Sequence, residues 1–251
     1  MSRIYTQAGD KKPEINKDSV FDFFEKRAAK VDEIGPIRAV IYQDKNPNLA
    51  ERRDAAEKSL LFPLMNLDRF STVLDAGCGS GRWAEVIIPH CAAYFGVDVS
   101  PGLVRVARER FDHYCNARFS VCSIDNISLE AIGARNYFTH ILSFGLFMYL
   151  NDDEVTMSLN RFVNMAAANA KVIFREPIAM QNRLTLQMHF SDDMEQMYNA
   201  IYRTEAELLD IVHATLGMEN FTQIGCGDVF ADASLNNRAE TKQRWFLWER
   251  R

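Results

Sequence analysis

The sequence predicts an α/β protein with a doubly wound, mostly parallel sheet of seven strands and an N-terminal helical cover. Three observations favour this fold class. From Thr72 onward, short apolar segments alternate with helix-length segments, as parallel strands and their crossover helices do. The first of these segments runs into a glycine-rich turn. The chain has 251 residues, 47% of them hydrophobic, and can bury one large core without disulfide bonds.

Composition excludes several other classes. Lys and Arg number 29 against 34 Asp and Glu, so the formal charge is −5 and a long nucleic-acid partner is not expected. No apolar run approaches the roughly 20 residues that cross a bilayer, and the polar N-terminus does not resemble a signal peptide. The five cysteines form no CxxC pair, which disfavours a zinc site or a disulfide framework. We therefore expect a cytoplasmic protein with free thiols, no metal and no membrane partner.

The first 70 residues predict an arm followed by helices. Residues 1–17 are expected to form a flexible arm. Apolar residues recur at helical spacing over 18–31, with Asp18 or Ser19 as the cap. A second helix is expected over 49–64, so residues 18–70 are predicted to form a helical cap on the domain over 71–251.

The remaining elements follow from strand-like runs and helix signals. The seven strands are expected over 72–75, 93–99, 118–123, 138–144, 171–175, 221–226 and 244–248. The helices are expected over 83–91, from Pro101, over 152–168 and over 204–216. Ser100 before Pro101 is a strong helix start, and Thr204 with Glu207 has capping-box spacing. Between the fifth strand and the last helix, a Met-rich insert over about 178–203 is expected to act as a lid.

Ligands of an open α/β sheet bind at the carboxyl ends of the strands, and the first strand ends in Asp75-Ala76-Gly77-Cys78-Gly79-Ser80-Gly81. Its glycines, at every second position, allow a sharp turn close to a ligand. The spacing is neither that of a dinucleotide fold nor that of a Walker A loop. The acid before the glycines suits a ligand that carries a positive charge near the turn.

The second strand ends in Gly96-Val97-Asp98. A carboxylate at this place can accept both hydroxyl groups of a ribose in charge-assisted hydrogen bonds. A lone Asp after a strand is more often a helix cap. Its combination with the glycine turn in a βαβ frame favours a nucleoside site.

These two motifs resemble the first and second motifs of class I S-adenosylmethionine-dependent methyltransferases, and the resemblance covers about residues 70–250. It implies a Rossmann-like methyltransferase fold and S-adenosylmethionine as the cofactor. Asp75 would lie near the methionine part, the glycines would line the cofactor, Asp98 would bind the ribose and Val99 would touch the adenine. We include Cys78, Arg82 and Trp83, next to the glycines, among the candidate cofactor-binding residues.

The later motifs extend the resemblance. Many relatives end the third strand with an acid that meets the adenine amino group, and this chain has Ser123 and Ile124 there, with Asp125 two positions after Ser123. The adenine contact is left open between Ser123 and Asp125. After the fourth strand, Ser143 and Phe144 match a site of backbone contact to the cofactor. Tyr42, from the N-terminal cover, is a further candidate near the methyl donor, with Gln43 and Arg53 close in sequence.

Three side chains are candidates for catalysis, each with a structural alternative. Tyr149 after the fourth strand can orient or deprotonate an acceptor, or pack as an aromatic residue. Glu176 after the fifth strand can bind a substrate, or pair with Arg175. His189 in the insert is the best-placed histidine for a general base, or a packing residue.

The function that these observations favour is methyl transfer to the oxygen or nitrogen of a small polar metabolite such as a natural product, sugar or amine. Alternatives are a methyltransferase for protein or tRNA and a non-catalytic cofactor-binding partner. A nicotinamide oxidoreductase is disfavoured by the glycine spacing. The sequence does not decide between a monomer and a homodimer, and it does not identify the acceptor.

Overall fold

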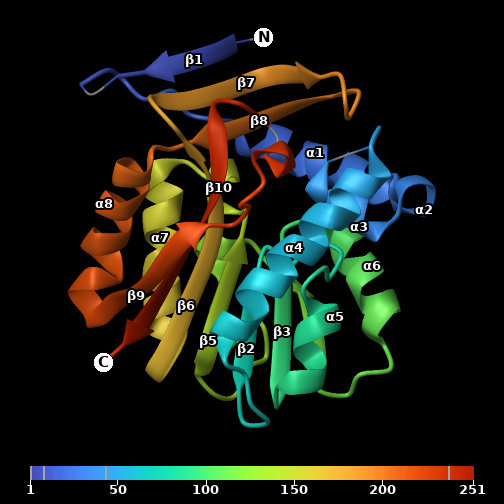
Figure 1. Ribbon diagram of the computed structural model, residues 1–251. Coiled ribbons are helices and arrows are strands. Elements are labelled where there is room, and N and C mark those ends of the chain that lie inside the picture. Colours follow the sequence, from blue (N-terminus) through green and yellow to red (C-terminus); the bar gives the residue numbers. More distant parts are fainter. Residues whose placement is uncertain (1, 8, 43, 237) are drawn as a thin grey trace.

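The computed structural model describes residues 2–7, 9–42, 44–236 and 238–251, and a sheet of seven strands forms its centre. The strands lie in the order β4-β3-β2-β5-β6-β10-β9 (Figure 1). β10 is antiparallel to β6 and β9, whereas β4, β3, β2, β5 and β6 pair in parallel. The predicted fold class is confirmed. The strands are β2 (Thr72–Ala76), β3 (Ala93–Asp98), β4 (Ala117–Val121), β5 (Phe138–Phe144), β6 (Ala166–Ala179), β9 (Phe221–Asp228) and β10 (Thr241–Arg250).

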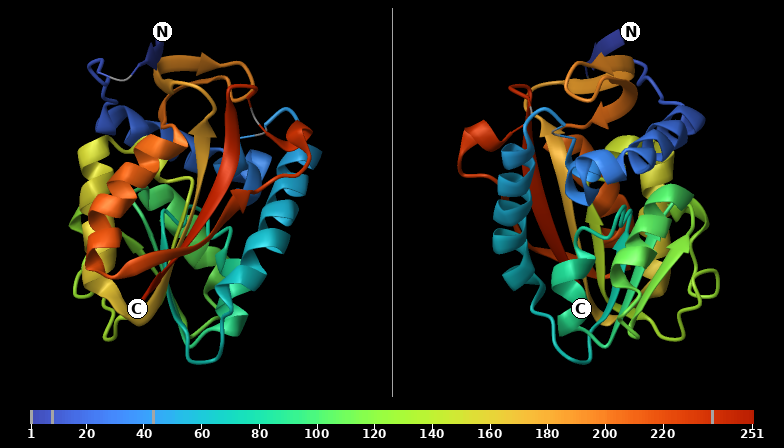
Figure 2. Two further views of the ribbon diagram at one scale, coloured as in Figure 1. Left: turned by 60° about the vertical axis from the view of Figure 1, so that its left-hand side comes forward. Right: turned by 90° about the vertical axis from the view of Figure 1, so that its right-hand side faces the viewer.

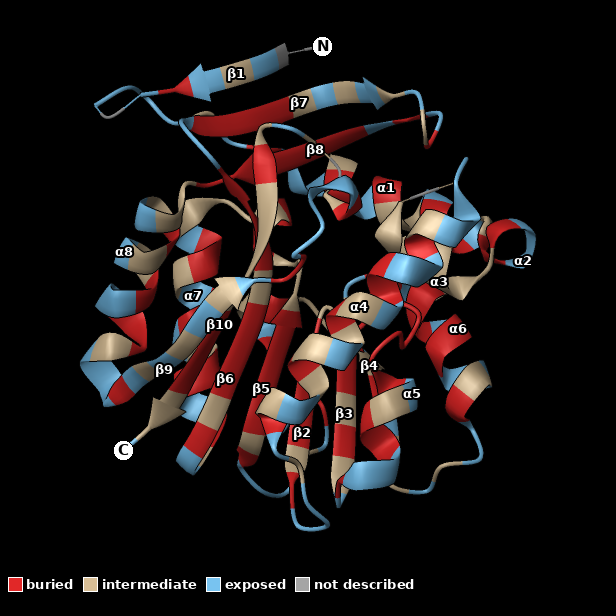
Figure 3. Cartoon of the chain, viewed as in Figure 1, coloured by how far each residue is buried: buried red, intermediate tan, exposed pale blue. Residues whose placement is uncertain are grey.

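Helices cover both faces of this sheet, because its central strands bury alternate side chains on opposite sides. On β6, Val172 packs in the core beneath α7 (Asp152–Met165) and α8 (Glu205–Thr215), and the next residue, Ile173, packs on the other face. That second face is covered by α4 (Pro47–Met65), α5 (Ala84–Ile87) and α6 (Pro101–Phe111). Figure 3 shows the buried central strands between these helices, and Figure 2 shows both layers from the side.

The N-terminal cover consists of α1 (Lys17–Ala29), α2 (Val31–Ile34) and α3 (Pro36–Ile41), followed by α4. The cap of α1 is Asn16, whose side chain accepts a hydrogen bond from the Ser19 backbone. The predicted caps Asp18 and Ser19 lie two and three residues too late, since both are inside the helix. None of the described helices is long and apolar enough to cross a membrane.

Two helix predictions had wrong limits. The segment over 83–91 forms only α5 and a 3-10 turn, η1 (Ile88–His90), because Pro89 lacks the N–H that a continuing helix needs. α7 ends at Met165, and β6 begins at once, so residues 166–168 are strand. The caps at Ser100 and Thr204 are confirmed, since each side chain accepts a backbone N–H of its helix. Other 3-10 turns are η2 (Ile124–Asn126), η3 (Phe147–Tyr149), η4 (Gly217–Glu219) and η5 (Ala233–Leu235).

A second, antiparallel sheet lies over the carboxyl ends of the parallel strands (Figure 1). It contains β1 (Ser2–Thr6), β7 (Arg183–Ser191) and β8 (Gln196–Tyr202) in the order β1-β7-β8. The arm expected over 1–17 is therefore a paired edge strand over residues 2–6. The whole β7–β8 hairpin lies within the Met-rich insert expected over about 178–203, and the sequence pattern did not predict these strands.

Candidate functional site

A cavity of about 500 Å³ opens at the carboxyl ends of the parallel strands. β2 pairs with β3 on one side and β5 on the other, so the strand order reverses at this point. Such a switch point is where open α/β sheets bind ligands. The cavity is lined by the strand ends, by α1, α3 and α4, and by the β7–β8 hairpin, and its volume suits a small molecule.

The glycine turn after β2 forms the floor of the cavity. Gly77, Gly79 and Gly81 all have positive φ values, at 76°, 52° and 76°. A Cβ atom on Gly79 would lie 2.8 Å from the Val40 Cγ1 atom of α3. The backbone N–H groups of Gly77 and Cys78 donate to the Val97 carbonyl oxygen at 2.9 and 3.0 Å. The turn is therefore folded back on β3 and packed closely enough that only glycine fits at position 79.

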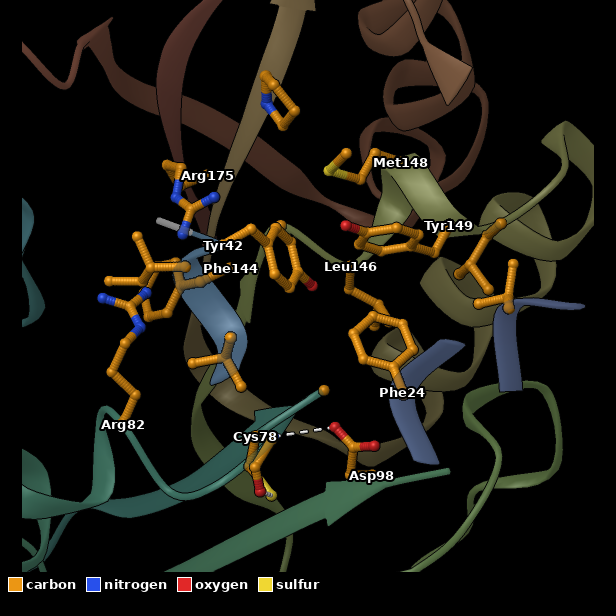
Figure 4. Close-up of a pocket in the computed structure, with 18 of the residues that line it drawn as sticks. Phe24, Tyr42, Cys78, Arg82, Asp98, Phe144, Leu146, Met148, Tyr149 and Arg175 are labelled. Carbon is orange, nitrogen blue, oxygen red and sulfur yellow. Dashed lines mark hydrogen bonds between the residues drawn. The ribbon is translucent and has the colours of Figure 1, made fainter. Parts of the chain in front are cut away.

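Asp98 ends β3 and faces this turn (Figure 4). One carboxylate oxygen accepts the Gly79 N–H at 2.9 Å, and the other accepts the Ser100 N–H, also at 2.9 Å. A carboxylate has about four acceptor positions, so these two hydrogen bonds do not exhaust its capacity to accept from a ligand. Burial raises the pKa of Asp98, and the backbone N–H groups oppose that shift.

Asp75 lies beneath the turn and is buried. Its Oδ2 atom accepts a hydrogen bond from the Tyr94 hydroxyl at 2.5 Å. Burial raises the pKa of Asp75 to about 6, so the carboxyl group is mainly ionised at neutral pH. A cationic ligand group in the cavity would favour the ionised form further.

The far end of the cavity contains Val99, Ser123, Ile124 and Asp125. The Ser123 hydroxyl donates to Asp125, so the two residues between which the adenine contact was left open are in contact. Lys17 of α1 lies 3.0 Å from Asp125 and also pairs with Glu154. The Ser123 hydrogen bond and the Lys17 ammonium hold the pKa of Asp125 below its usual range.

Aromatic rings form one wall of the cavity. Tyr149, on η3, lies with its ring centroid 5.0 Å from that of Phe24 and 6.5 Å from that of Tyr42 (Figure 4). Tyr198 and Tyr202 of β8 extend the wall. Burial raises the pKa of Tyr42, Tyr149 and Tyr198. These hydroxyl groups therefore stay protonated at neutral pH and can orient a ligand rather than remove a proton from it.

The structure does not bring four of the predicted site residues to the cavity wall. Gly81 is absent from the described lining residues and packs against Phe111 of α6, where a Cβ atom would lie 2.7 Å from the ring. Glu176 is buried, and its two oxygens accept the N–H groups of Phe147 and Met148 at 2.9 and 3.1 Å. It holds the turn that carries Tyr149, instead of facing a substrate, and burial raises its pKa to about 7. His189 packs its ring against Tyr198, outside the described lining residues. The Ser143 hydroxyl is buried in the sheet.

A charged network borders the cavity on the side of α4. Arg82, after the glycine turn, donates to Asp54 at 2.8 Å and to Glu57 at 2.7 Å. Arg175 of β6 donates to the same Glu57 at 3.1 Å. Burial alone would raise the pKa of Glu57, but the two guanidinium groups lower it to about 2. Trp83 packs its ring 4.5 Å from Phe144, which closes the wall next to this network.

Several lining residues were not predicted from the sequence. Lys17, Glu154, Arg175 and Arg238 lie at the cavity through tertiary packing, and their local sequence shows no motif. Gln43, which the sequence placed beside Tyr42, lies outside the described residues. Within the described part of the chain, no group of three or more His, Cys, Asp or Glu side chains could hold a metal ion.

Comparison with known sequences adds an independent finding. Residues 73–169 match a family model described as a methyltransferase domain. Over 156 residues the chain is 25% identical to phosphoethanolamine N-methyltransferase 1 of Zea mays. The matched region covers 62% of this chain and 29% of that protein.

Solved structures show the same fold. The Haemonchus contortus phosphoethanolamine N-methyltransferase 1, in complex with phosphoethanolamine and S-adenosylhomocysteine, matches with a TM-score of 0.72 and 16% identity over 93% of this chain and 48% of that one. The magnesium protoporphyrin IX methyltransferase of Synechocystis with bound S-adenosylhomocysteine matches with a TM-score of 0.62 and 16% identity, over 94% and 99% of the two chains. The chain thus spans less than half the length of the two phosphoethanolamine methyltransferases.

Proposed function

We propose that this chain methylates a nitrogen or oxygen atom of a small polar metabolite. The premise is that it carries a methyltransferase domain of the class I S-adenosylmethionine-dependent family. One observation carries the proposal. The Gly77–Gly81 turn and the Asp98 carboxylate face the same cavity and are joined by the Gly79–Asp98 hydrogen bond. At the switch point of the sheet, the backbone of the turn can therefore approach a ligand closely, next to an acid that can bind hydroxyl groups.

The residues of the cavity fit this cofactor. The free acceptor positions of Asp98 suit the two ribose hydroxyl groups, and the buried Asp75 carboxyl suits the cationic methionine part. Ser123 and Asp125 provide oxygens for an adenine amino group. When bound, S-adenosylmethionine supplies a methyl group that is already activated on a positively charged sulfur. The protein then has to hold the acceptor in line with that group and exclude water.

The tyrosine-rich wall favours an amine nitrogen as the acceptor. Aromatic faces attract the ammonium form of an amine, which has to lose one proton to solvent before its lone pair can take the methyl group from the sulfur. Tyr149 and Tyr42 place two protonated hydroxyl groups where they can orient the neutral amine. A hydroxyl acceptor needs a general base, and no histidine stands among the described lining residues. Two of the compared proteins are named as N-methyltransferases, which agrees with this choice.

The covers of the cavity support a small acceptor over a protein or tRNA. Helix α1 and the β7–β8 hairpin both contribute lining residues, among them Phe24 and Tyr198. These elements are joined by the hydrogen bond from Gln196 to the Phe23 carbonyl oxygen at 3.1 Å. A macromolecular substrate would have to displace this packed cover.

A transfer assay with a labelled methyl group tests the proposal. The protein is incubated with labelled S-adenosylmethionine and, separately, with small amines, small alcohols, a peptide mixture and tRNA. We expect label in an amine. Label in peptide or tRNA alone would refute the small acceptor. Binding of S-adenosylhomocysteine without transfer to any acceptor class would favour the non-catalytic alternative.

A further inference from the structure

We propose that Arg53, with Arg175 beside it, binds an anionic group of a ligand in the cavity, either a carboxylate or a phosphate. This inference deepens the proposed function and rests on it for the identity of the ligand. Arg53 lies on α4, one turn before Glu57, and lines the cavity. The residue is only 4% exposed.

Two of the three guanidinium nitrogens of Arg53 lack a partner within the described part of the chain. The Nε and Nη2 atoms are buried and have no hydrogen-bond partner among the described residues. Arg175 shares this property in part, since its Nε atom is also buried and unpartnered there. Burial and then the charge of Arg175 lower the pKa of Arg53 to about 10, so the Arg53 guanidinium group is cationic at neutral pH.

Two of the neighbouring acids, Glu57 and Asp54, are engaged elsewhere. Glu57 accepts hydrogen bonds from Arg82 and Arg175, and Asp54 pairs with Arg82 and Lys58. Asp193, in the turn of the hairpin, attracts Arg53 electrostatically, and its Oδ2 atom is buried without a hydrogen-bond partner among the described residues. No ion pair within 4.0 Å joins Asp193 to Arg53 in the part of the chain that the structure describes. In the described structure, Arg53 therefore lacks a carboxylate partner.

Such an arrangement is costly without a ligand. A buried charge that is neither paired nor hydrogen-bonded destabilises the folded state, and a second cation nearby adds repulsion. An anion in the cavity removes both costs. Carboxylates and phosphates match the forked N–H groups of a guanidinium, and a pair of charge-assisted bonds gives strong recognition. Figure 4 shows Arg175 on the same side of the cavity as Arg82, where such an anion would lie.

The anionic group can come from the methyl donor, which carries an α-carboxylate, or from an acidic acceptor. The variant Arg53→Gln separates the two sources. Its matched control is Arg52→Gln, which removes the same charge one residue away, at an exposed position whose contact with Asp232 spans 3.6 Å. Three probes are titrated by calorimetry: S-adenosylhomocysteine, 5′-methylthioadenosine, which lacks the carboxylate, and inorganic phosphate added to the S-adenosylhomocysteine complex.

If Arg53 binds the donor carboxylate, Arg53→Gln weakens S-adenosylhomocysteine about 10- to 100-fold and leaves 5′-methylthioadenosine unchanged. If it binds an acidic acceptor, S-adenosylhomocysteine is unaffected, and phosphate binding to the complex is lost in Arg53→Gln but kept in Arg52→Gln. Unchanged affinity for both S-adenosylhomocysteine and phosphate would overturn the inference.

Folding of the variant has its own control. Arg53→Gln without ligand should melt at or above the temperature of the wild type, because an unpaired buried charge is removed. If Arg53→Gln does not fold, Arg53→Lys replaces it, because lysine keeps the positive charge but lacks the forked N–H groups. Unchanged binding of both S-adenosylhomocysteine and phosphate in Arg53→Lys would also overturn the inference. If the wild type binds neither adenosine probe, the proposed function fails, and phosphate titrated on the free protein still tests Arg53.

Discussion

Glu57 gives the sharpest prediction for stability, because this one buried carboxylate is shared by Arg82 and Arg175. The substitution Glu57→Gln removes the charge and keeps the volume. A pKa of about 2 against an ordinary value of 4.5 corresponds to about 3 kcal/mol of stabilisation at pH 7. Breaking a buried ion pair from one side costs about 3–5 kcal/mol, so the two values agree.

The sign of the pH dependence follows from the lowered pKa. The stabilisation from Glu57 is fully present above pH 4.5 and is lost as the pH falls toward 2. The difference in the free energy of unfolding between wild type and Glu57→Gln should therefore be constant from pH 7 to 5. It should narrow by about 2 kcal/mol between pH 5 and 3.

Urea denaturation followed by circular dichroism measures this difference. Glu51→Gln is the matched control, since Glu51 lies on the same helix but is exposed, and a change within about 0.5 kcal/mol is expected there. A loss below about 1 kcal/mol for Glu57→Gln at pH 7, or a difference that does not narrow in acid, would refute the shared ion pair.

Two further predictions concern the elements that shape the site. Gly79→Ala should lower the free energy of unfolding by about 1–3 kcal/mol, since its Cβ would lie 2.8 Å from Val40. Adding Val40→Ala should restore part of this loss. An unchanged free energy of unfolding in Gly79→Ala would contradict the close packing. Glu176 has a pKa raised by burial to about 7, so its contribution to stability falls as the pH rises through 7. The loss of unfolding free energy caused by Glu176→Gln should therefore be smaller at pH 8 than at pH 5. A loss that grows with pH would mean that the pKa of Glu176 is lowered in the folded protein, against this prediction.

The sequence predicted the central sheet because its strands are governed by local burial. Each of the seven apolar runs overlaps one of the seven strands, although those over 93–99 and 118–123 extend past the ends of β3 and β4. The caps at Ser100 and Thr204 were found from their own side chains. β1 was missed, since an edge strand of five residues is defined by its pairing with β7 and not by its own pattern. The helix over 83–91 was overextended because the apolar spacing continues past Pro89, which ends it.

The residues of the candidate site also divide into those positioned by local sequence and those positioned by contacts between distant segments. Asp75, Asp98 and the glycines could be placed at the carboxyl ends of β2 and β3 from the sequence, because a strand–turn–helix unit positions them locally. For Glu176 the sequence offered a substrate contact or a pair with Arg175, whereas the structure gives it backbone N–H partners 28 and 29 residues earlier in the chain. Arg238 reaches the tyrosine wall from the loop before β10, where it donates to Tyr198. Contacts over such separations have no signal in the sequence alone.

The central claim is that the Gly77–Gly81 turn and Asp98 form an S-adenosylmethionine site, and a calorimetric titration with S-adenosylhomocysteine tests it most directly. We predict one binding site in the wild type and an affinity about 100-fold lower in Asp98→Ala, the loss of two hydrogen bonds to a charged acceptor. Circular dichroism verifies that the variant is folded, and a nicotinamide dinucleotide should give no heat. No binding to the wild type, or equal affinity in a folded Asp98→Ala, would contradict the account.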